Sequence, residues 1–448
     1  NYHGPFFYYI GLIPFYLGGV STFSLRFMPA LFGSLIVLLL TPLRKRIGWS
    51  GIISSGFLLA VSPSGTFYSR YAIHETYLIF FTLALVVSGE AFLRTKKSAY
   101  FYAIAASMAF IVSIKETYII TFGVLGLSLT LSWVTNLVLH WKRQKNLNLV
   151  EGKQAIVGAV SSICRALKER KGAILGSTAV FLAVNVFLYS SIFSNLQGLK
   201  GIISTLAIWI STGVGESGHN KPFLYYLGLL LRYDLSMLLL GILGLYYCLR
   251  KSDVFTLFIC MWFSGMFIAY SLIPYKTPWL ILNLTLPLAI LAGNFIKFVK
   301  DSLSSRTGFA VFILLFSLVL ANSCYHSSDL SFRHYDDESQ ELVYVHTFRD
   351  IYDLVDRIDT VSKFAEGKHT AIEVLASTPW PLQWYLRDHT QMTYWGEIID
   401  SPNAPIIICS EMDLEILKPR LEEAYHQETY RLRPGVNLVF LVRKRIWD

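Results

Sequence analysis

The feature that most constrains this chain is a series of apolar runs, each long enough to form a membrane-spanning helix. A helix of about 20 apolar residues crosses the hydrocarbon core of a bilayer and satisfies its own backbone polar groups there. Nine such runs lie near residues 23–42, 49–67, 75–93, 117–139, 173–192, 233–249, 254–272, 278–299 and 308–322. A shorter run at 99–114 is counted as a tenth. We therefore expect a polytopic α-helical membrane protein with about ten transmembrane helices.

Composition supports this expectation and excludes other classes. The 448 residues are 54% hydrophobic and only 15% charged, with a mean hydropathy of +0.48, which is too apolar for a soluble protein of this size. The net charge of +9 comes from short clusters between apolar runs rather than from one basic face, so we expect no nucleic-acid partner. Five scattered cysteines without a CxxC pair indicate neither a disulfide framework nor a zinc site.

The distribution of Lys and Arg predicts the topology. Basic clusters occupy alternate loops: 44–46, 94–97, 142–171, 250–251 and 297–300. The positive-inside rule makes these loops cytoplasmic and leaves the opposite loops for extracytoplasmic chemistry. With ten crossings, both ends of the chain lie on the same side. We expect the plasma membrane of a prokaryote as the location, because no organelle signal is present. The chain starts at Asn1 without an initiator Met or signal peptide, so we also expect a missing upstream segment.

Two aromatic segments in the outer loops are similar in character. His3–Tyr9 and Asn220–Tyr226 each run from a polar residue through a Pro to a pair of tyrosines. Pro suits a first helical turn and Tyr suits the headgroup layer, which predicts interfacial helices. Simple aromatic anchoring is the alternative.

The chain changes character after Asn322. We expect a transmembrane domain at 1–322, a linker at 323–342 and a small extracytoplasmic α/β domain at 343–448. Within this last domain, helices are predicted at 345–365, 380–387 and 411–425, and strands at 371–376, 404–409 and 437–442.

Charged side chains near the ends of the spans are the candidate functional residues, because a charge at membrane depth is costly. Arg70 and His74 are suited to hold a phosphate, and Glu75 is a candidate catalytic or metal-linked carboxylate. A carboxylate that merely stabilises a helix N-terminus is the alternative for Glu75. Lys115 and Glu116 form either a phosphate contact or a self-neutralising pair.

Two further outer loops carry cations and aromatic residues. The Gly-rich segment 213–221, which includes His219 and Lys221, either closes over a ligand or simply turns. Residues 273–279 offer Lys276 to a phosphate and Trp279 to a sugar ring, with interfacial anchoring as the competing interpretation. No Walker, GxSxG or HExxH motif supports ATP-driven pumping or hydrolysis.

Taken together, these pieces resemble the GT-C class of polytopic glycosyltransferases, which includes the dolichyl-phosphate-mannose protein mannosyltransferases and bacterial aminoarabinose transferases. The resemblance covers most of residues 1–300. A prokaryotic mannosyltransferase-like subgroup is more similar still, through four segments in the same order. These segments are Lys115-Glu116-Thr117, Pro222–Tyr226, Lys276–Trp279 and Trp380–Arg387.

The resemblance implies inverting transfer of a sugar from a polyprenyl-phosphate donor to a protein, lipid or glycan acceptor. It also implies that an acidic motif in the first outer loop, which would precede Asn1, supplies the main base. The candidate catalytic residue within the chain is Glu75. The candidate substrate-binding residues are His3, Arg70, His74, Lys115, Glu116, His219, Lys221, Lys276 and Trp279. No cofactor is indicated, although a divalent cation suits this chemistry.

Two other functions stay open at this point. A non-catalytic lipid-linked-sugar binding or flippase-associated protein would keep the lipid groove and lack the upstream acid. A secondary transporter would need inverted repeats and charges near the bilayer midplane, whereas most charges here lie at the ends of spans.

Overall fold

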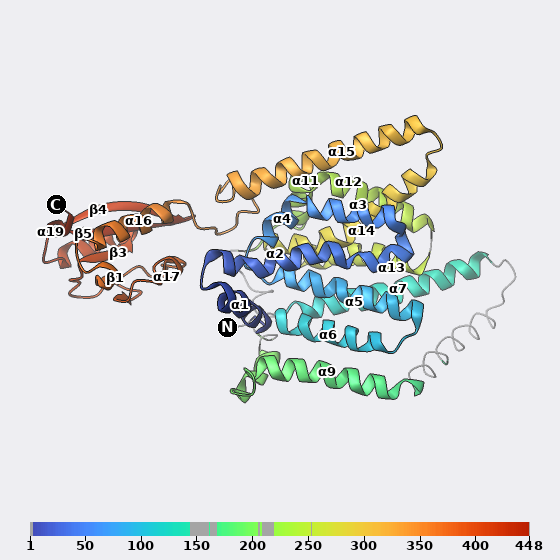
Figure 1. Cartoon of the computed structure of the whole chain (residues 1–448), viewed down its shortest axis with the longest axis horizontal. Coiled ribbons are helices and arrows are strands. Elements are labelled where there is room, and N and C mark those ends of the chain that lie inside the picture. Colours follow the sequence, from blue (N-terminus) through green and yellow to red (C-terminus); the bar gives the residue numbers. More distant parts are fainter. Residues whose placement is uncertain are drawn as a thin grey trace. The chain divides into compact units, whose positions relative to one another are not determined.

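The structure is a computed structural model that describes residues 3–143, 161, 168–204, 207, 219–251 and 253–447 (Figure 1). Most of the predicted basic loop 142–171 and all of residues 213–218 of the Gly-rich segment lie outside these residues. The chain divides into two compact units, Asn1–Arg333 and His334–Asp448. Each unit is described by itself.

The first unit is a helical bundle (Figure 1). Its main helices are α1 Phe6–Gly18, α2 Thr22–Leu39, α3 Arg44–Ala60, α4 Pro63–Ser69, α5 Glu75–Thr95, α6 Ala99–Ile114, α7 Tyr118–Arg143, α9 Lys171–Tyr189, α11 Tyr225–Tyr233, α12 Leu235–Lys251, α13 Val254–Leu272, α14 Leu282–Ser302 and α15 Arg306–Ser328. Nine of the ten predicted spans each fall mainly on one of these helices, whereas the span 49–67 covers parts of α3 and α4. The predicted helical membrane fold is confirmed.

Length and composition identify seven candidate spans among the described residues, or eight if α11 and α12 form one bent span. The segment Thr22–Ala60 counts as one candidate although it contains both α2 and α3, which run in opposite directions (Figure 1). Helix α6 has only 16 residues and falls below the length expected of a span. These two features account for the difference from ten.

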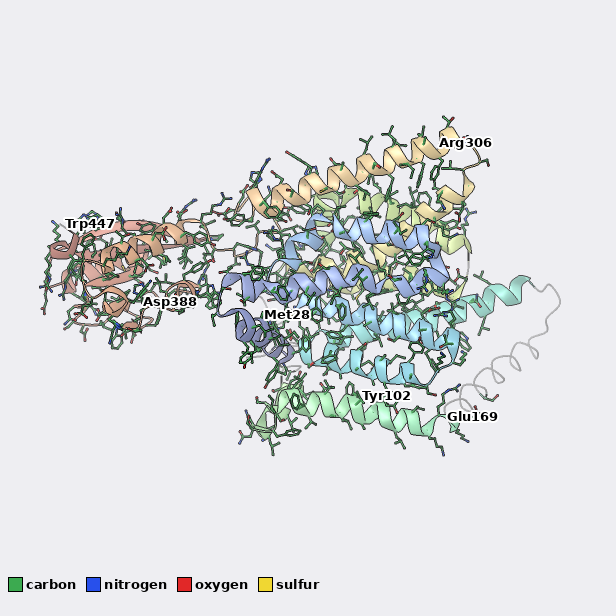
Figure 2. All side chains as sticks on the ribbon, in the orientation of Figure 1. Met28, Tyr102, Glu169, Arg306, Asp388 and Trp447 are labelled. Carbon is green, nitrogen blue, oxygen red and sulfur yellow. The ribbon has the colours of Figure 1, made fainter. Side chains whose placement is uncertain are left out.

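Helix α14 forms the centre of the bundle and is almost completely buried, packing on α3, α12 and α13. Small residues allow these helices to approach closely, as is common in membranes. A Cβ on Gly293 would collide with the Ser55 hydroxyl of α3, and one on Gly244 would collide with the Leu291 carbonyl. At the periphery, Gly176 of α9 makes room for Tyr102 of α6 (Figure 2).

Two breaks in the helices shape the end of the bundle opposite the basic loops. Ser62 accepts a hydrogen bond from the Gly65 backbone N–H, and Pro63 follows, so α4 starts as a separate helix inside the predicted span 49–67. Helix α11 is bent by 113° from α12 at Asp234. The Ser62 hydroxyl donates to the Asp234 carboxylate over 2.6 Å, so the two breaks are tied together.

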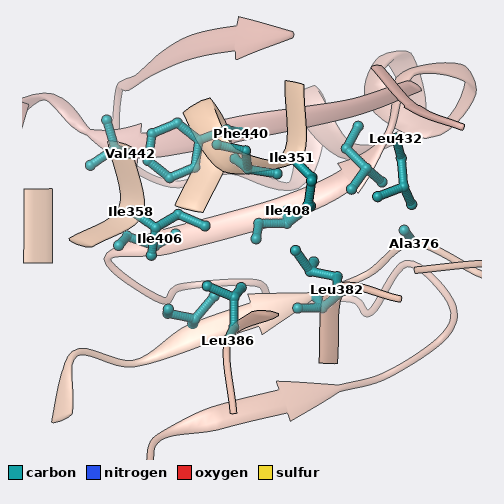
Figure 3. Packing of buried hydrophobic residues seen from close by; sticks show 14 of the residues in the cluster. Ile351, Ile358, Ala376, Leu382, Leu386, Ile406, Ile408, Leu432, Phe440 and Val442 are labelled. Carbon is teal, nitrogen blue, oxygen red and sulfur yellow. The ribbon is translucent and has the colours of Figure 1, made fainter. Parts of the chain in front are cut away.

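The second unit contains a five-stranded sheet in the order β2-β1-β3-β5-β4. Its strands are β1 Ile372–Val374, β2 Met392–Tyr394, β3 Ile406–Ser410, β4 Tyr425–Arg433 and β5 Val436–Arg443. Strands β1, β2 and β3 are parallel, whereas β5 is antiparallel to both β3 and β4. Helix α16, Asp350–Ser362, covers one face through Ile351 and Ile358 (Figure 3). The predicted small C-terminal α/β domain is confirmed.

Some predicted boundaries differ from the structure. The predicted linker begins at 323, but α15 continues to Ser328 and a π-helical turn, Asp329–Arg333, follows it. The predicted helix 345–365 is α16 and starts only at Asp350. The predicted helix 411–425 is wrong, because this segment holds only short turns around α18, Leu414–Leu417.

Candidate functional site

The candidate site lies at the end of the bundle where α4 meets α5 and α6 meets α7. The segment before α1 also reaches this end (Figure 1). Gly4 explains how it does so. The Gly4 backbone N–H donates to the Ile114 carbonyl over 3.2 Å, and a Cβ at this position would collide with the Ser113 carbonyl. Glycine therefore lets the chain lie directly on the end of α6 and places His3 beside the turn that follows.

A buried ion pair forms the centre of the site. The Lys115 ammonium, in the turn between α6 and α7, donates a short hydrogen bond to the Glu75 carboxylate at the start of α5. Both residues are buried. Burial alone would lower the pKa of Lys115, but the carboxylates of Glu75 and then Glu116 outweigh it and raise that pKa. Lys115 is thus held charged without full contact with water.

A second pair lies next to the first. His3 Nδ1 is 3.0 Å from the buried Glu116 carboxylate, while the His3 side chain keeps about a third of its surface exposed. Burial would raise the pKa of Glu116, but the hydrogen bond from His3 and the charge of Lys115 lower it overall. The Glu116 carboxylate is therefore ionised and orients the His3 ring.

His74 completes this group. Its ring lies 4.7 Å from that of His3 and 4.5 Å from that of Phe7. Burial, followed by the nearby His3 and Lys115, lowers its pKa well below the ordinary value, so His74 is neutral. Its Nε2 atom is buried and has no hydrogen-bond partner among the described residues. A buried polar atom without a partner is costly, which makes this nitrogen a natural contact for a bound polar group.

Arg70 faces a different neighbour. Its Nη1 donates to the Ser331 carbonyl over 2.9 Å, and its guanidinium stacks 4.0 Å above the Phe332 ring. Burial, with the nearby Arg26, lowers the pKa of Arg70. Its contacts therefore connect α4 to the π-helical turn after α15 rather than to the Lys115–Glu75 pair.

The two predicted outer loops, around His219 and Lys276, pair with one another. Asn220 and Tyr275 form an antiparallel bridge, and the Lys276 backbone N–H donates to the His219 carbonyl over 3.0 Å. The Lys276 ammonium is buried and donates to the Ile273 carbonyl over 2.6 Å and to the Lys221 carbonyl over 3.2 Å. Lys276 thus holds the two loops together.

Aromatic residues connect the loop pair to the ion-pair group. The half-buried Trp279 ring lies 6.5 Å from the Tyr68 ring of α4, edge to face. Tyr226 of α11 donates to the Thr277 carbonyl over 3.1 Å. Tyr68, Tyr226 and Tyr270 all lie close enough to Glu75 to interact with it electrostatically. The sequence analysis named Tyr226 within an aromatic segment but did not predict this position near Glu75, and it missed Tyr270, because nothing in an apolar run distinguishes an inward-facing Tyr from a lipid-facing one.

The site shows no preformed metal centre. Among the residues that the structure describes, no group of three or more His, Cys, Asp and Glu side chains is arranged to hold a metal ion. The acidic side chains at the centre, Glu75 and Glu116, each pair with a basic residue instead.

Comparisons with known proteins agree with this architecture. The family model for dolichyl-phosphate-mannose-protein mannosyltransferase matches residues 2–167. A search of curated proteins found no match. The structure is similar to crystal structures of ArnT from Cupriavidus metallidurans, bound to undecaprenyl phosphate and in the apo state. The TM-scores are 0.65 and 0.63 at 13% identity, covering 98% of this chain and 88% or 87% of ArnT.

A more distant similarity is to the oligosaccharyltransferase of Archaeoglobus fulgidus, whose crystal structure is a complex with Zn and sulfate. Its TM-score is 0.53 at 14% identity, covering 97% of this chain and 65% of that protein. These likenesses show the fold. The chain has the GT-C fold of a multi-pass membrane protein, and the resemblance that the sequence motifs indicated is confirmed.

Proposed function

We propose that this GT-C-fold protein is an inverting glycosyltransferase that moves a sugar from a polyprenyl-phosphate-linked donor to a protein, lipid or glycan acceptor. The observation that carries the proposal is the buried Lys115–Glu75 pair beside the Glu116–His3 pair. Burying charged side chains in a membrane protein costs free energy, so a buried group of charges indicates a functional role. The similarity to ArnT, crystallised with undecaprenyl phosphate, supports a lipid-linked donor.

The proposed chemistry follows from charge. Transfer leaves a polyprenyl phosphate behind, and a cation that meets the growing negative charge stabilises the transition state. Lys115 is that cation, because its present partner is a carboxylate that an incoming phosphate can replace. His3, oriented by Glu116, and the unpartnered Nε2 of His74 supply further contacts to the phosphate or sugar.

Glu75 then has a role that depends on donor binding. In the structure its carboxylate is occupied by the Lys115 ammonium. When the donor phosphate takes over Lys115, Glu75 is left to accept the proton of the acceptor hydroxyl, a role that the resemblance gave to an acid upstream of Asn1. Donor binding would thus activate the base, which prevents proton abstraction in an empty site.

The remaining predicted features belong to this proposal. Helix α15 begins at the basic end of the bundle and ends near Arg70, so the chain leaves the first unit at the end that carries the site. We place this end and the C-terminal unit outside the plasma membrane of a prokaryote, with membrane lipids as neighbours. The sugar lies beside the two paired loops, which carry His219, Lys221, Lys276 and Trp279. We expect a divalent cation only if it enters together with the donor.

The test uses membranes that contain the full chain, with labelled polyprenyl-phosphate mannose and polyprenyl-phosphate glucose as probe donors. Release of polyprenyl phosphate is measured. We expect release by the wild type and a loss of about 10²–10⁴-fold in Glu75→Gln, as for removal of a general base. Lys97→Ala, an exposed cation at the opposite end, is the matched control and should release at the wild-type rate.

A second function is favoured by one specific observation. Both central carboxylates are already paired with cations, which suits a protein that binds a lipid-linked sugar without reacting. This function predicts that the wild type binds undecaprenyl phosphate but releases no sugar from either probe donor, with the Lys115→Met variant losing the binding. That result would refute the transferase proposal.

A further inference from the structure

A large cavity lies inside the membrane bundle and extends from Arg46, near the basic loops, to Phe122, which packs in the same cluster as Tyr77. Its volume is about 760 Å³, and residues of α3, α5, α6, α7 and α13 line it. Helix α7 packs on α13, whereas α6 packs on α5 and α9, so the cavity separates two packed groups of helices. On α7 the lining runs from Phe122 to Asn136, a distance of roughly 20 Å along the helix.

The wall of the cavity is mostly apolar, formed by leucine, valine and phenylalanine side chains and by two glycines, Gly89 and Gly126. Leu93 and Leu129 line it and are also about half exposed on the bundle surface, so the cavity reaches the surface that faces lipid. Water gains little in such a space, since it finds few polar partners there. Hydrocarbon chains, which surround the bundle, fit it instead.

The charges that line the cavity lie at the end near the basic loops. Arg46 Nε donates to the Glu90 carboxylate over 2.8 Å, and Arg94 lies 3.3 Å from the same carboxylate. Asp253 accepts from the Thr256 backbone N–H, which caps α13. The Arg46 guanidinium lies 5.8 Å from the centre of the Phe255 ring, and its side chain is 39% exposed. A partly exposed guanidinium is well suited to a phosphate.

We infer that this cavity is a second lipid site. It binds a phosphate-bearing membrane lipid whose head group lies at Arg46 and whose chains extend toward Phe122. The head of this lipid therefore lies at the end of the bundle opposite Lys115, so the site is separate from the proposed donor site and does not depend on the proposed function. A glycerophospholipid and a polyprenyl phosphate share this chemistry.

The glycines allow a clean test. Neither Gly89 nor Gly126 has a heavy atom within 4 Å of an added Cβ, so leucine at either position would fill the cavity. Gly123, on the same helix as Gly126, is equally open but does not line the cavity, and Gly123→Leu is the matched control. The full chain is delipidated in detergent and loaded with dioleoylphosphatidylglycerol, and bound lipid is counted by native mass spectrometry.

We expect one tightly bound lipid in the wild type and in Gly123→Leu, and at least tenfold weaker binding in Gly126→Leu and Gly89→Leu. Arg46→Gln should weaken this lipid at least tenfold and leave binding of dioleoylglycerol, which lacks a phosphate, unchanged. Displacement by undecaprenyl phosphate would identify an isoprenoid as the natural source, and retention of the phospholipid would identify a glycerolipid. Wild-type binding in both leucine variants, or equal effects of Arg46→Gln on the two lipids, would overturn the inference.

Discussion

Replacing Lys115 by methionine tests the central ion pair directly. Methionine keeps most of the side-chain volume and removes the charge, so the Glu75 carboxylate stays buried without its partner. Breaking a buried pair in this way costs about 3–5 kcal/mol. For a unit of this size, with ~2 °C per kcal/mol, the melting temperature should fall by roughly 6–10 °C.

The double variant Lys115→Met with Glu75→Gln separates the pair from the packing. Removing both charges leaves no buried ion, and replacement of whole buried pairs is often nearly neutral. We therefore expect the double variant to recover to within about 1–2 kcal/mol of the wild type. Relative to Lys115→Met alone, the double variant should therefore regain about 2–3 kcal/mol.

The assay is thermal unfolding of the full chain in detergent, followed by intrinsic fluorescence at pH 7 and repeated at rising pH. The raised pKa of Lys115 means that its stabilisation is complete below the ordinary value of 10.5 and is lost as pH rises through the folded-state value. Wild type and Lys115→Met should therefore converge only above pH 10.5. If Lys115→Met melts at the wild-type temperature, or the double variant is no better than the single one, the pair is not the buried contact described here.

Three further predictions concern the surroundings of this pair. Gly4→Ala should cost about 1–3 kcal/mol of stability, because the new methyl group collides with backbone, while Gly11→Ala, which meets no atom within 4 Å, should cost nothing measurable by the same unfolding assay. The lowered pKa of Glu116 stabilises the fold above its ordinary value of 4.5, and this contribution is lost as pH falls through the folded-state pKa. In Glu116→Gln the melting temperature should therefore fall less steeply than in the wild type as the pH is lowered below 4.5. The same steepness in both proteins would contradict this role of Glu116. Lys276→Met should lower the melting temperature and the turnover number and leave the KM for a probe donor unchanged, because Lys276 joins the two loops. A tenfold higher KM at an unchanged melting temperature would instead make Lys276 a phosphate contact.

The sequence predicted the helices of the bundle well, because hydropathy over some 20 residues reports directly on the membrane. It predicted the second unit less completely. Strand β3 is buried on both faces and stands out as an apolar run, whereas β4, Tyr425–Arg433, is a polar edge strand with alternating exposure. Its pattern resembles a solvated helix end or a loop. Only pairing with β5 along its length makes it a strand, and a single sequence does not show that partner.

The candidate site was predicted residue by residue, but not the pairing. Glu75 and Glu116 were predicted because a charge near membrane depth is costly, and His3 was predicted from the resemblance to the GT-C class. Their partners depend on which helix ends meet, which is a tertiary property. Glu90 was missed altogether, although an acid within an apolar run is the same kind of signal. Glu90 lies near the basic loops, where charged side chains are common, so its charge alone does not indicate a site.

Lys115 and Lys276 show how the structure divides residues that the sequence treats alike. Both are buried lysines in turns at the same end of the bundle. Lys115 faces a carboxylate, and an incoming phosphate can replace one anion by another without leaving a backbone group unsatisfied. Lys276 is held by two carbonyl oxygens, and removing it would leave both without this donor and separate the loops that it joins. A phosphate can therefore compete for Lys115 at little cost, whereas competition for Lys276 requires the loops to open.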